Sequence, residues 1–237
     1  MRACYLFLLI LAGLMAGAQD STNQTGKKIV VNSLKDDVRQ SLAQDMFKYP
    51  DFVAARLVYK DYEVTEARLN YNRYFQQFYF INDKQDTMAL ARPELFNMFI
   101  LNKDTFYYHD QSFSYLLTHY PDINLVKSEF ISLVGKEKKG LYGTYSAVSS
   151  VDNEKTFTND ESQSLRWLKI DENAIYKMKE KIMLKDKYNH FYAASKKNFY
   201  NLFSKKEKEL KQYFEDHKVN FNKEEDLLKL MEFLNGK

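Results

Sequence analysis

Cysteine, glycine and proline are scarce in this sequence: its 237 residues include one Cys, seven Gly and three Pro. The one cysteine, Cys4, lies in an N-terminal apolar run, so the chain has no pair of thiols for a disulfide. The glycine-rich phosphate loop, the Gly-x-Ser-x-Gly elbow and the His-Glu-x-x-His zinc motif are absent as well. Stability must therefore come from a packed core, and familiar signatures of nucleotide, hydrolase and zinc-protease chemistry are missing.

Charge of one sign is not in excess either. Lysine and arginine total 35 against 32 aspartates and glutamates, which gives a formal net charge of +3. Nucleic acids and anionic membranes are bound through clustered positive charge, and this balance provides little of it. The lysines of 205–211 are interpreted as the solvated face of a helix. We expect no nucleic-acid partner.

The N-terminus has the pattern of a secretory signal peptide. Arg2 is followed by an apolar run over residues 3–15 and by small residues at 16–18, after which signal peptidase would cleave. A membrane-spanning helix needs about 20 apolar residues, more than this run supplies. A lipid-anchoring motif would place its cysteine after the run, whereas Cys4 stands near its start. We expect residues 1–18 to be removed and the mature protein to be exported, without a transmembrane span.

Aromatic residues are abundant, and the 18 Tyr and 18 Phe favour strands, where large side chains pack on a pleated surface. In residues 63–71 apolar and polar side chains alternate, the pattern of a strand with one wet face. Similar runs follow one another with short turns between them, at 52–59, 63–71, 74–81, 87–91, 95–101, 105–109, 113–120 and 123–133. The joints leave no room for helical crossovers, so the runs predict an antiparallel meander. Several runs are apolar on both faces, which predicts a curled or barrel-like sheet.

Weaker signals cover the rest of the body. Residues 19–32 are expected to form a flexible N-terminal segment, and 33–47 a short helix. A long excursion is expected over 134–164, which contains three glycines and a polar stretch. Strand-like runs then resume at 165–170, 175–184 and 188–193. The folded body is expected to be a single β-rich domain over 33–237.

Amphipathic helices are predicted near the C-terminus, within residues 195–235. Ser204 has a glutamate three residues on, the pattern of a capping box, and apolar residues follow at helical spacing. Asn222 repeats this arrangement, and Gly236 stands where a helix is expected to end. The predicted fold class is therefore α+β, mainly β, with an antiparallel meander and C-terminal helices packed on it.

Histidines supply the few candidates for chemistry. His109 and His119 end consecutive predicted strands, so the rim of the sheet could bring them together as a metal or general-base site. Two ordinary polar residues at strand ends are the favoured interpretation. A triad of Ser112, His119 and Asp122 can be written down, but a chain rich in Ser and Asp permits many such sets. We therefore assign no catalytic, cofactor-binding or metal-binding residue and expect no cofactor.

Tyrosines are the other candidates, as contacts to a ligand or partner. Tyr142 and Tyr145 lie in the expected excursion, where a loop would expose them. Tyr107 and Tyr108 belong to an aromatic-rich pair of strands and are interpreted as core. Facing outward, they would instead form a rigid amphipathic surface suited to a protein partner or a sugar ring.

Two stretches resemble a recurring pattern in uncharacterised exported proteins of the Bacteroidetes. The first is ARLNYN at 67–72, followed by a strand that ends in FI at 80–81. The second is LFSKK at 202–206, followed by VNFNKEEDL at 219–227. The resemblance spans most of the mature chain and implies export in a Gram-negative bacterium, either to the periplasm or outside the cell. Its motifs are strand edges and helix caps, so it implies no functional residues.

Three hypotheses for the function follow. The favoured one is a non-catalytic envelope protein that binds a protein or a ligand, with the sheet edge or the excursion as the contact surface. The first alternative is a carrier that encloses a lipid or another apolar ligand in the curled sheet. The second alternative is a hydrolase with an unrecognised site, in which His109, His119 and an acid converge in a cleft.

Overall fold

A single antiparallel sheet forms the body of the protein. The computed structural model describes residues 28–32, 45–139, 145–148 and 172–236. Its strands are β1 (Lys28–Asn32), β2 (Val53–Tyr59), β3 (Val64–Asn72), β4 (Gln77–Ile81), β5 (Thr87–Ala89), β6 (Phe96–Leu101), β7 (Asp104–His109), β8 (Ser112–Tyr120), β9 (Ile123–Lys139), β10 (Tyr145–Val148), β11 (Glu172–Asp186) and β12 (Phe191–Ala193). The expected signal peptide and most of the expected helix at 33–47 lie outside the described residues.

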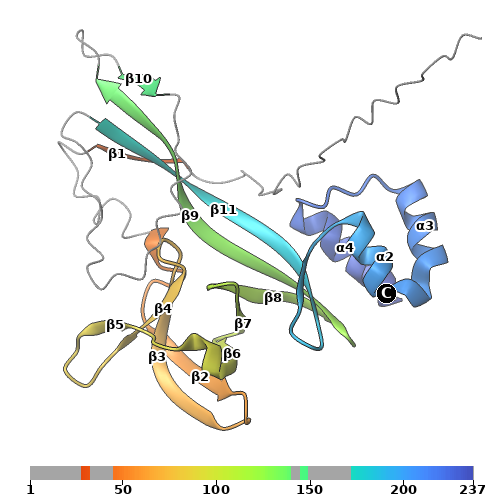
Figure 1. The fold of residues 1–237 in the computed structure, drawn as a ribbon, viewed down its shortest axis with the longest axis horizontal. Helices are drawn as coiled ribbons and strands as arrows, with labels where there is room; N and C mark the ends of the chain where they lie inside the picture. The colour runs from red at the N-terminus through yellow and green to blue at the C-terminus, as the bar shows by residue number, and fades with distance from the viewer. Residues whose placement is uncertain (1–27, 33–44, 140–144, 149–171, 237) are drawn as a thin grey trace, which may run out of the picture.

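The strand order is β1-β11-β9-β8-β7-β6-β2-β3-β4-β5, with β10 paired to β9 and β12 to β11 (Figure 1). The chain therefore meanders outward from β2 to β5, returns, and meanders in the other direction from β6. A short 3-10 helix, η1 (Pro93–Leu95), makes the return and places β6 beside β2. The predicted antiparallel meander is confirmed, and the sheet is curled but not closed into a barrel.

Aromatic rings fill the inside of the curl. Register irregularities occur between β2 and β6 and between β8 and β9, and such bulges increase the twist and bend of a sheet. The ring of Phe78 lies 5.1 Å from that of Phe99 and 4.7 Å from that of Phe113, centroid to centroid. All three side chains are buried, and full burial of one such ring contributes about 1.5–3 kcal/mol. The protein's own aromatic side chains therefore fill the interior of the curled sheet.

A long pair of strands, β9 and β11, crosses the molecule and joins the curled sheet to the helices (Figure 1). β9 runs to Lys139, so the expected excursion over 134–164 is wrong for its first six residues, which continue the strand. β10 then pairs back onto β9. β1 pairs with β11, which corrects the end of the segment 19–32 that was expected to be flexible. The run expected at 165–170 lies outside the described residues.

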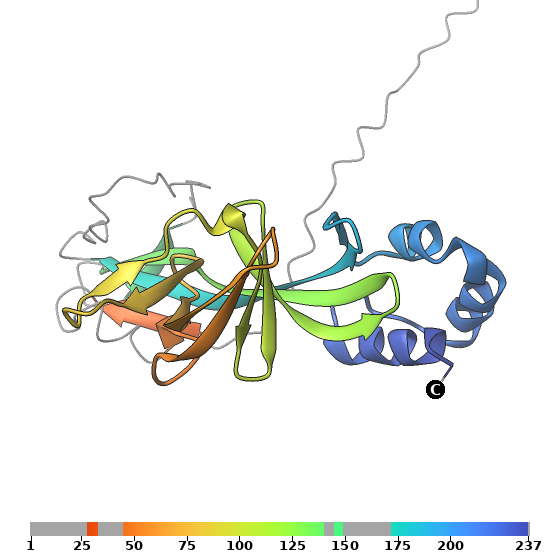
Figure 2. The same cartoon turned by 90° about the horizontal axis from the view of Figure 1, so that it is seen from below.

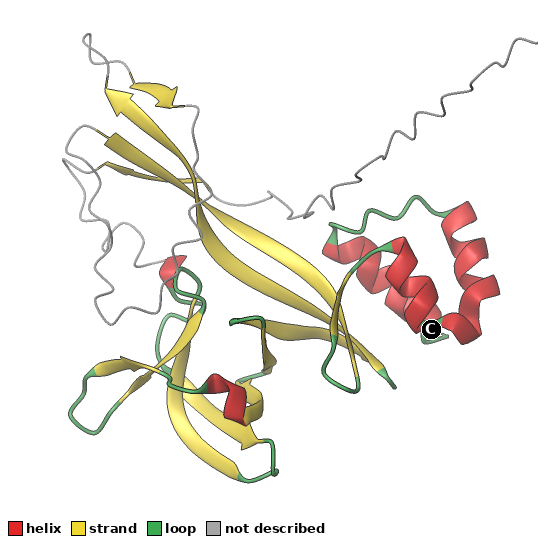
Figure 3. Cartoon of the chain, in the orientation of Figure 1, coloured by secondary structure: helices red, strands yellow, loops and turns green. Residues whose placement is uncertain are grey.

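Three α-helices lie at one end of the sheet, as Figures 2 and 3 show: α2 (Lys196–Leu202), α3 (Glu207–Asp216) and α4 (Glu224–Leu234). Their apolar faces pack on the ends of β8, β9 and β11, where Leu125 and Leu184 are fully buried. This second core confirms that the C-terminal helices pack on the sheet. None of the helices in the described ranges has the length and apolar character needed to cross a membrane.

The helix starts differ from the predicted caps. Ser195 caps α2, because its side chain accepts a hydrogen bond from the Asn198 backbone N–H at 3.3 Å. Ser204 instead begins a 3-10 turn, η2 (Ser204–Lys206), and α3 starts at Glu207 without a side-chain cap. Lys223, not Asn222, precedes α4. Gly236 does have the positive φ of 73° expected of a residue that ends a helix.

Candidate functional site

The two candidate histidines lie at opposite ends of β8. His109 ends β7 and pairs with Ser112, the first residue of β8. His119 lies near the end of β8, where its Nδ1 is 2.7 Å from Oδ1 of Asn124. His119 lies seven positions after Ser112 along β8, which is about 23 Å at about 3.3 Å per residue. The rim of the sheet therefore does not bring His109 and His119 together, which agrees with the favoured interpretation of them as two separate polar residues at strand ends.

The other candidates do not assemble into a site. Ser112 donates a hydrogen bond to Oε1 of Gln76 at 2.8 Å, and Asp122 forms an ion pair with Lys187 at 3.2 Å. Neither contact involves His119. Tyr142 lies outside the described residues. Tyr145 is the first residue of β10 and is paired with Lys139 of β9, so it belongs to a strand rather than to a loop.

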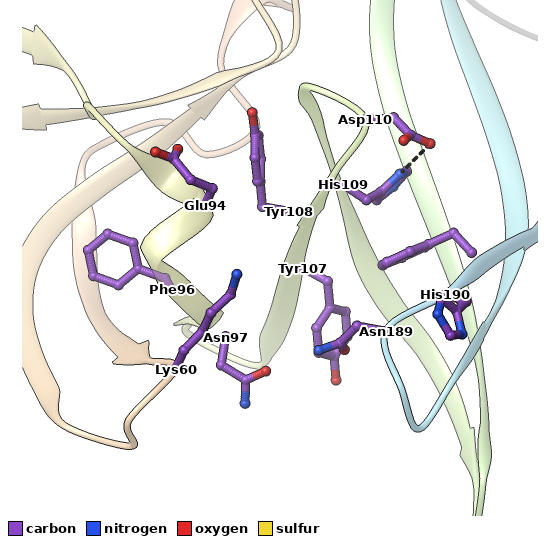
Figure 4. Close-up of a pocket in the computed structure, with 11 residues that line it drawn as sticks. Lys60, Glu94, Phe96, Asn97, Tyr107, Tyr108, His109, Asp110, Asn189 and His190 are labelled. Atoms are coloured by element: carbon purple, nitrogen blue, oxygen red, sulfur yellow. Dashed lines mark ion pairs between the residues drawn. The ribbon is translucent and has the colours of Figure 1, made fainter.

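An open groove of about 460 Å³ lies beside His109 (Figure 4). We call it the His109 groove. Three separate parts of the chain line it: the η1–β6 return with the end of β2, the end of β7, and the β11–β12 turn. The lining residues are Lys60, Glu94, Phe96, Asn97, Tyr107, Tyr108, His109, Asp110, Asn189, His190 and Phe191.

The end of β7 forms the middle of the groove. Figure 4 shows the Tyr108 side chain between Glu94 on one side and His109 on the other. Burial raises the pKa of Tyr108, and the nearby negative charge of Glu94 raises it further. Burial also raises the pKa of Tyr107, whose ring has the Nζ of Lys185 at 4.4 Å from its centroid. Both tyrosines therefore stay protonated at neutral pH and keep a hydroxyl that can donate.

His109 is held rigidly in the wall of the groove. Its ring stacks on Phe191 at 3.9 Å with an interplanar angle of 20°. Its Nε2 shares a hydrogen bond of 2.6 Å with Oγ of Ser114, and this Oγ lies 2.6 Å from Oγ of Ser128. Its Nδ1 is 3.5 Å from the Asp110 carboxylate, too long for a strong hydrogen bond. Burial lowers the pKa of His109, so the ring is neutral at neutral pH.

Asp110, His109 and Ser114 contact one another in the acid–histidine–serine arrangement of a catalytic triad. The serine, however, cannot reach a ligand. Ser114 is 0% exposed, and its hydroxyl is already engaged on both sides, by His109 and by Ser128. A nucleophile needs an open path to the bond that it attacks. In this arrangement the two serines instead fix the orientation of the His109 ring.

The β11–β12 turn is organised by Asp186. Its carboxylate accepts hydrogen bonds from the backbone N–H groups of Tyr188 at 2.8 Å and His190 at 2.9 Å. It also contacts Nδ1 of His190 at 3.0 Å and the hydroxyl of Tyr192 at 3.3 Å. Burial alone would raise the pKa of Asp186, but the hydrogen bonds outweigh it and lower that pKa. The turn thereby holds Asn189, which has a φ of 66°, at the edge of the groove.

The η1–β6 return supplies the opposite wall. The Lys60 backbone N–H donates to the Leu95 carbonyl at 3.1 Å, which fixes the end of β2 against η1. Arg92 precedes η1 with a φ of 53°, a strained value for a residue with a side chain. Phe96 is nearly buried and its ring lies 4.3 Å from that of Tyr59. Lys60 and Glu94 therefore project from a fixed backbone.

A cluster of buried charges lies elsewhere, where β9 leaves the curled sheet. We call it the Glu129 cluster. The Glu129 carboxylate contacts Lys48 at 3.4 Å, Arg73 at 3.1 Å and Lys127 at 3.5 Å, and it accepts a hydrogen bond from the hydroxyl of Tyr115. Burial alone would raise the pKa of Glu129, but the three cations and the tyrosine outweigh it and lower that pKa to about 2.

The Glu129 cluster links the two cores of the protein. Lys127 reaches Glu224, the first residue of α4, at 2.7 Å and Glu180 of β11 at 3.3 Å. Lys48 lies over the Tyr115 ring, 3.7 Å from its centroid, and burial lowers the pKa of Lys48. These side chains are mostly buried, and none of them lines the His109 groove. We therefore interpret the cluster as structural.

Comparison with known proteins finds no match: no family model, no curated protein and no solved structure is significantly similar to this chain. The site must therefore be interpreted from its own geometry. Within the described ranges, no three His, Asp or Glu side chains are grouped as metal ligands would be.

Most residues of the His109 groove could not be predicted from the sequence. Lys60, Asn97, Asn189 and His190 stand in no recognisable motif, and they come from loops far apart in the chain. The aromatic pair Tyr107 and Tyr108 was the one sequence feature that pointed to this groove. The pair was interpreted as core, and the alternative was a rigid amphipathic surface for a ligand or partner. Of the candidate residues His109, His119 and Tyr145, His109 is the one that lines the groove.

Proposed function

We propose that this protein is an exported, non-catalytic binding protein whose ligand occupies the His109 groove. One observation carries the proposal: aromatic rings and polar side chains from three separate loops line one open cavity of about 460 Å³. Small-molecule sites are typically concave, about 300–1,000 Å³ in volume, and lined by apolar walls with a few placed polar groups. The export part rests on the signal pattern of residues 1–18.

The two alternatives find less support. A carrier of an apolar ligand needs an empty interior, whereas Phe78, Phe99 and Phe106 occupy the inside of the curl with 0–1% exposure. A hydrolase needs a reachable nucleophile beside a base. Ser114 is buried, and His119 is at the far end of β8 from His109. A rigid groove without such a pair favours binding.

The proposal can be tested without knowing the ligand in advance. The mature chain, labelled with ¹⁵N, is titrated with separate mixtures of neutral saccharides, acidic saccharides, amino acids, short peptides and polyamines. Amide shifts are then mapped by nuclear magnetic resonance. We expect at least one mixture to shift the amides of 107–110 and 189–191 together. If no mixture shifts these two segments, or if shifts concentrate elsewhere, the groove is not the binding site.

A further inference from the structure

We propose that the ligand of the His109 groove is a neutral saccharide. This inference rests on the proposed function, because it names the chemical class that the same groove would take. Three features of the groove support it: the balance of charge, the type of polar group, and the aromatic platform.

Neither sign of charge dominates the groove. Lys60, Glu94 and Asp110 line it, and Lys185 and Asp186 lie directly behind it. A phosphate or another anion would meet two lining carboxylates with one lining lysine as its counter-charge. A cationic ligand seeking an aromatic face would find the Tyr107 ring already contacted by the Lys185 ammonium at 4.4 Å. A neutral ligand avoids both conflicts.

Planar groups with two polar atoms are concentrated here: two carboxylates, Glu94 and Asp110, and two amides, Asn97 and Asn189. Such groups can pair with two neighbouring hydroxyls of a sugar ring, which each offer a donor and an acceptor. Within the described part of the chain, the side-chain amides of Asn97 and Asn189 have no hydrogen-bond partner. Their donors and acceptors are therefore available to a ligand that carries several hydroxyl groups.

Tyr108 supplies the aromatic platform. Figure 4 shows its ring between Glu94 and His109, on the side of the groove away from Asn97 and Asn189. The ring is supported from the core by Phe113, at 5.1 Å between centroids. Phe96 packs against Tyr59, and Phe191 packs against His109, so both of these rings are braced from behind. One face of a pyranose ring presents C–H groups, which pack on an aromatic ring while the hydroxyls around its edge reach polar side chains. Tyr108 and the four planar groups together match this amphipathic shape.

Isothermal titration calorimetry of the mature protein tests the inference with named probes. The neutral probes are cellobiose, maltotriose and N,N′-diacetylchitobiose; the charged probes are trigalacturonate and spermidine. We expect one neutral probe to bind. Tyr108→Ala should weaken it at least about tenfold, because it removes the ring platform, and Tyr108→Phe should stay within about threefold of the native protein. Asn97→Ala should weaken binding about fivefold, since a good hydrogen bond contributes about 1 kcal/mol.

Asn201→Ala is the matched control, since Asn201 is exposed on α2 and does not line the groove. Circular dichroism establishes that each variant is folded. Binding of a charged probe or a peptide to the groove, without any neutral saccharide, overturns this inference and leaves the binding function standing. Equal losses in Tyr108→Phe and Tyr108→Ala also overturn it, because a ring platform survives the first change. The absence of groove shifts with every mixture overturns the binding function itself.

Discussion

Glu129→Gln is the substitution whose effect the structure predicts most fully. Glutamine keeps the shape of the side chain but removes the negative charge that three cations share: Lys48, Arg73 and Lys127 lie within 3.5 Å of the carboxylate. The amide would leave these cations without their common counter-ion in a site where Glu129 is 11% exposed. Breaking a buried ion pair by removing one partner destabilises a protein by about 3–5 kcal/mol.

The pKa of Glu129 gives an independent magnitude. The shift from 4.5 to about 2 corresponds to about 3 kcal/mol of folding free energy, at about 1.4 kcal/mol for each pKa unit. Because the pKa is lower in the folded state, this stabilisation is fully present above pH 4.5. It is lost as the pH falls from 4.5 toward 2, since the unfolded chain then binds the proton more readily.

Urea denaturation at a series of pH values checks both magnitudes. We expect Glu129→Gln to lower the free energy of unfolding by about 3 kcal/mol at pH 7. Its loss of stability between pH 4.5 and pH 2 should be smaller than that of the native protein by a similar amount. Glu66→Gln is the control: Glu66 is exposed on β3, and its loss should cost less than about 1 kcal/mol. Equal midpoints and equal pH slopes for Glu129→Gln and the native protein would refute the reasoning.

Three further predictions, which use four substitutions, test other parts of the structure. Asp186→Asn weakens the hydrogen bonds that hold the β11–β12 turn, so hydrogen–deuterium exchange should become faster at 188–190; unchanged exchange would mean that the turn does not depend on the carboxylate. Phe99→Ala leaves a cavity in the filled curl and should cost about 3–5 kcal/mol in urea denaturation, whereas a cost below about 1 kcal/mol would indicate a loosely packed interior. Ser195→Ala removes the cap of α2 and should cost about 1 kcal/mol, while Ser204→Ala, which removes no cap, should be nearly neutral; the reverse order would restore the capping box predicted from the sequence.

Local sequence patterns predicted the strands of this fold well, because the alternation of apolar and polar side chains that marks a strand is contained within that strand. The run at 63–71 and the observed strand Val64–Asn72 differ by one residue at each end. Pairing between distant segments has no such local signature. β6 lies beside β2, with Ala55 opposite Leu101, because η1 turns the chain back. β1 was missed because its partner, β11, lies more than 140 residues further along the chain.

The candidate site shows the same limit. Two paired antiparallel strands run in opposite directions, so their C-terminal ends lie at opposite ends of the pair. His109 at the end of β7 and His119 near the end of β8 are therefore far apart. The caps of α3 and α4 were misplaced by two residues and one residue, because neighbouring positions compete for the start of a helix. The His109 groove combines loops from three regions of the chain. The spacing of residues in the sequence does not indicate how close these loops lie in space.

The role of the His109 groove is tested most directly by hydrogen–deuterium exchange of the mature protein, with and without a saturating neutral saccharide. Segments 104–112 and 186–193 both line the groove but are far apart in sequence. A ligand in the groove should slow exchange in both segments at once in the native protein and have no such effect in Tyr108→Ala. Slower exchange in neither segment, or the same slowing in both proteins, would contradict a ligand seated against Tyr108.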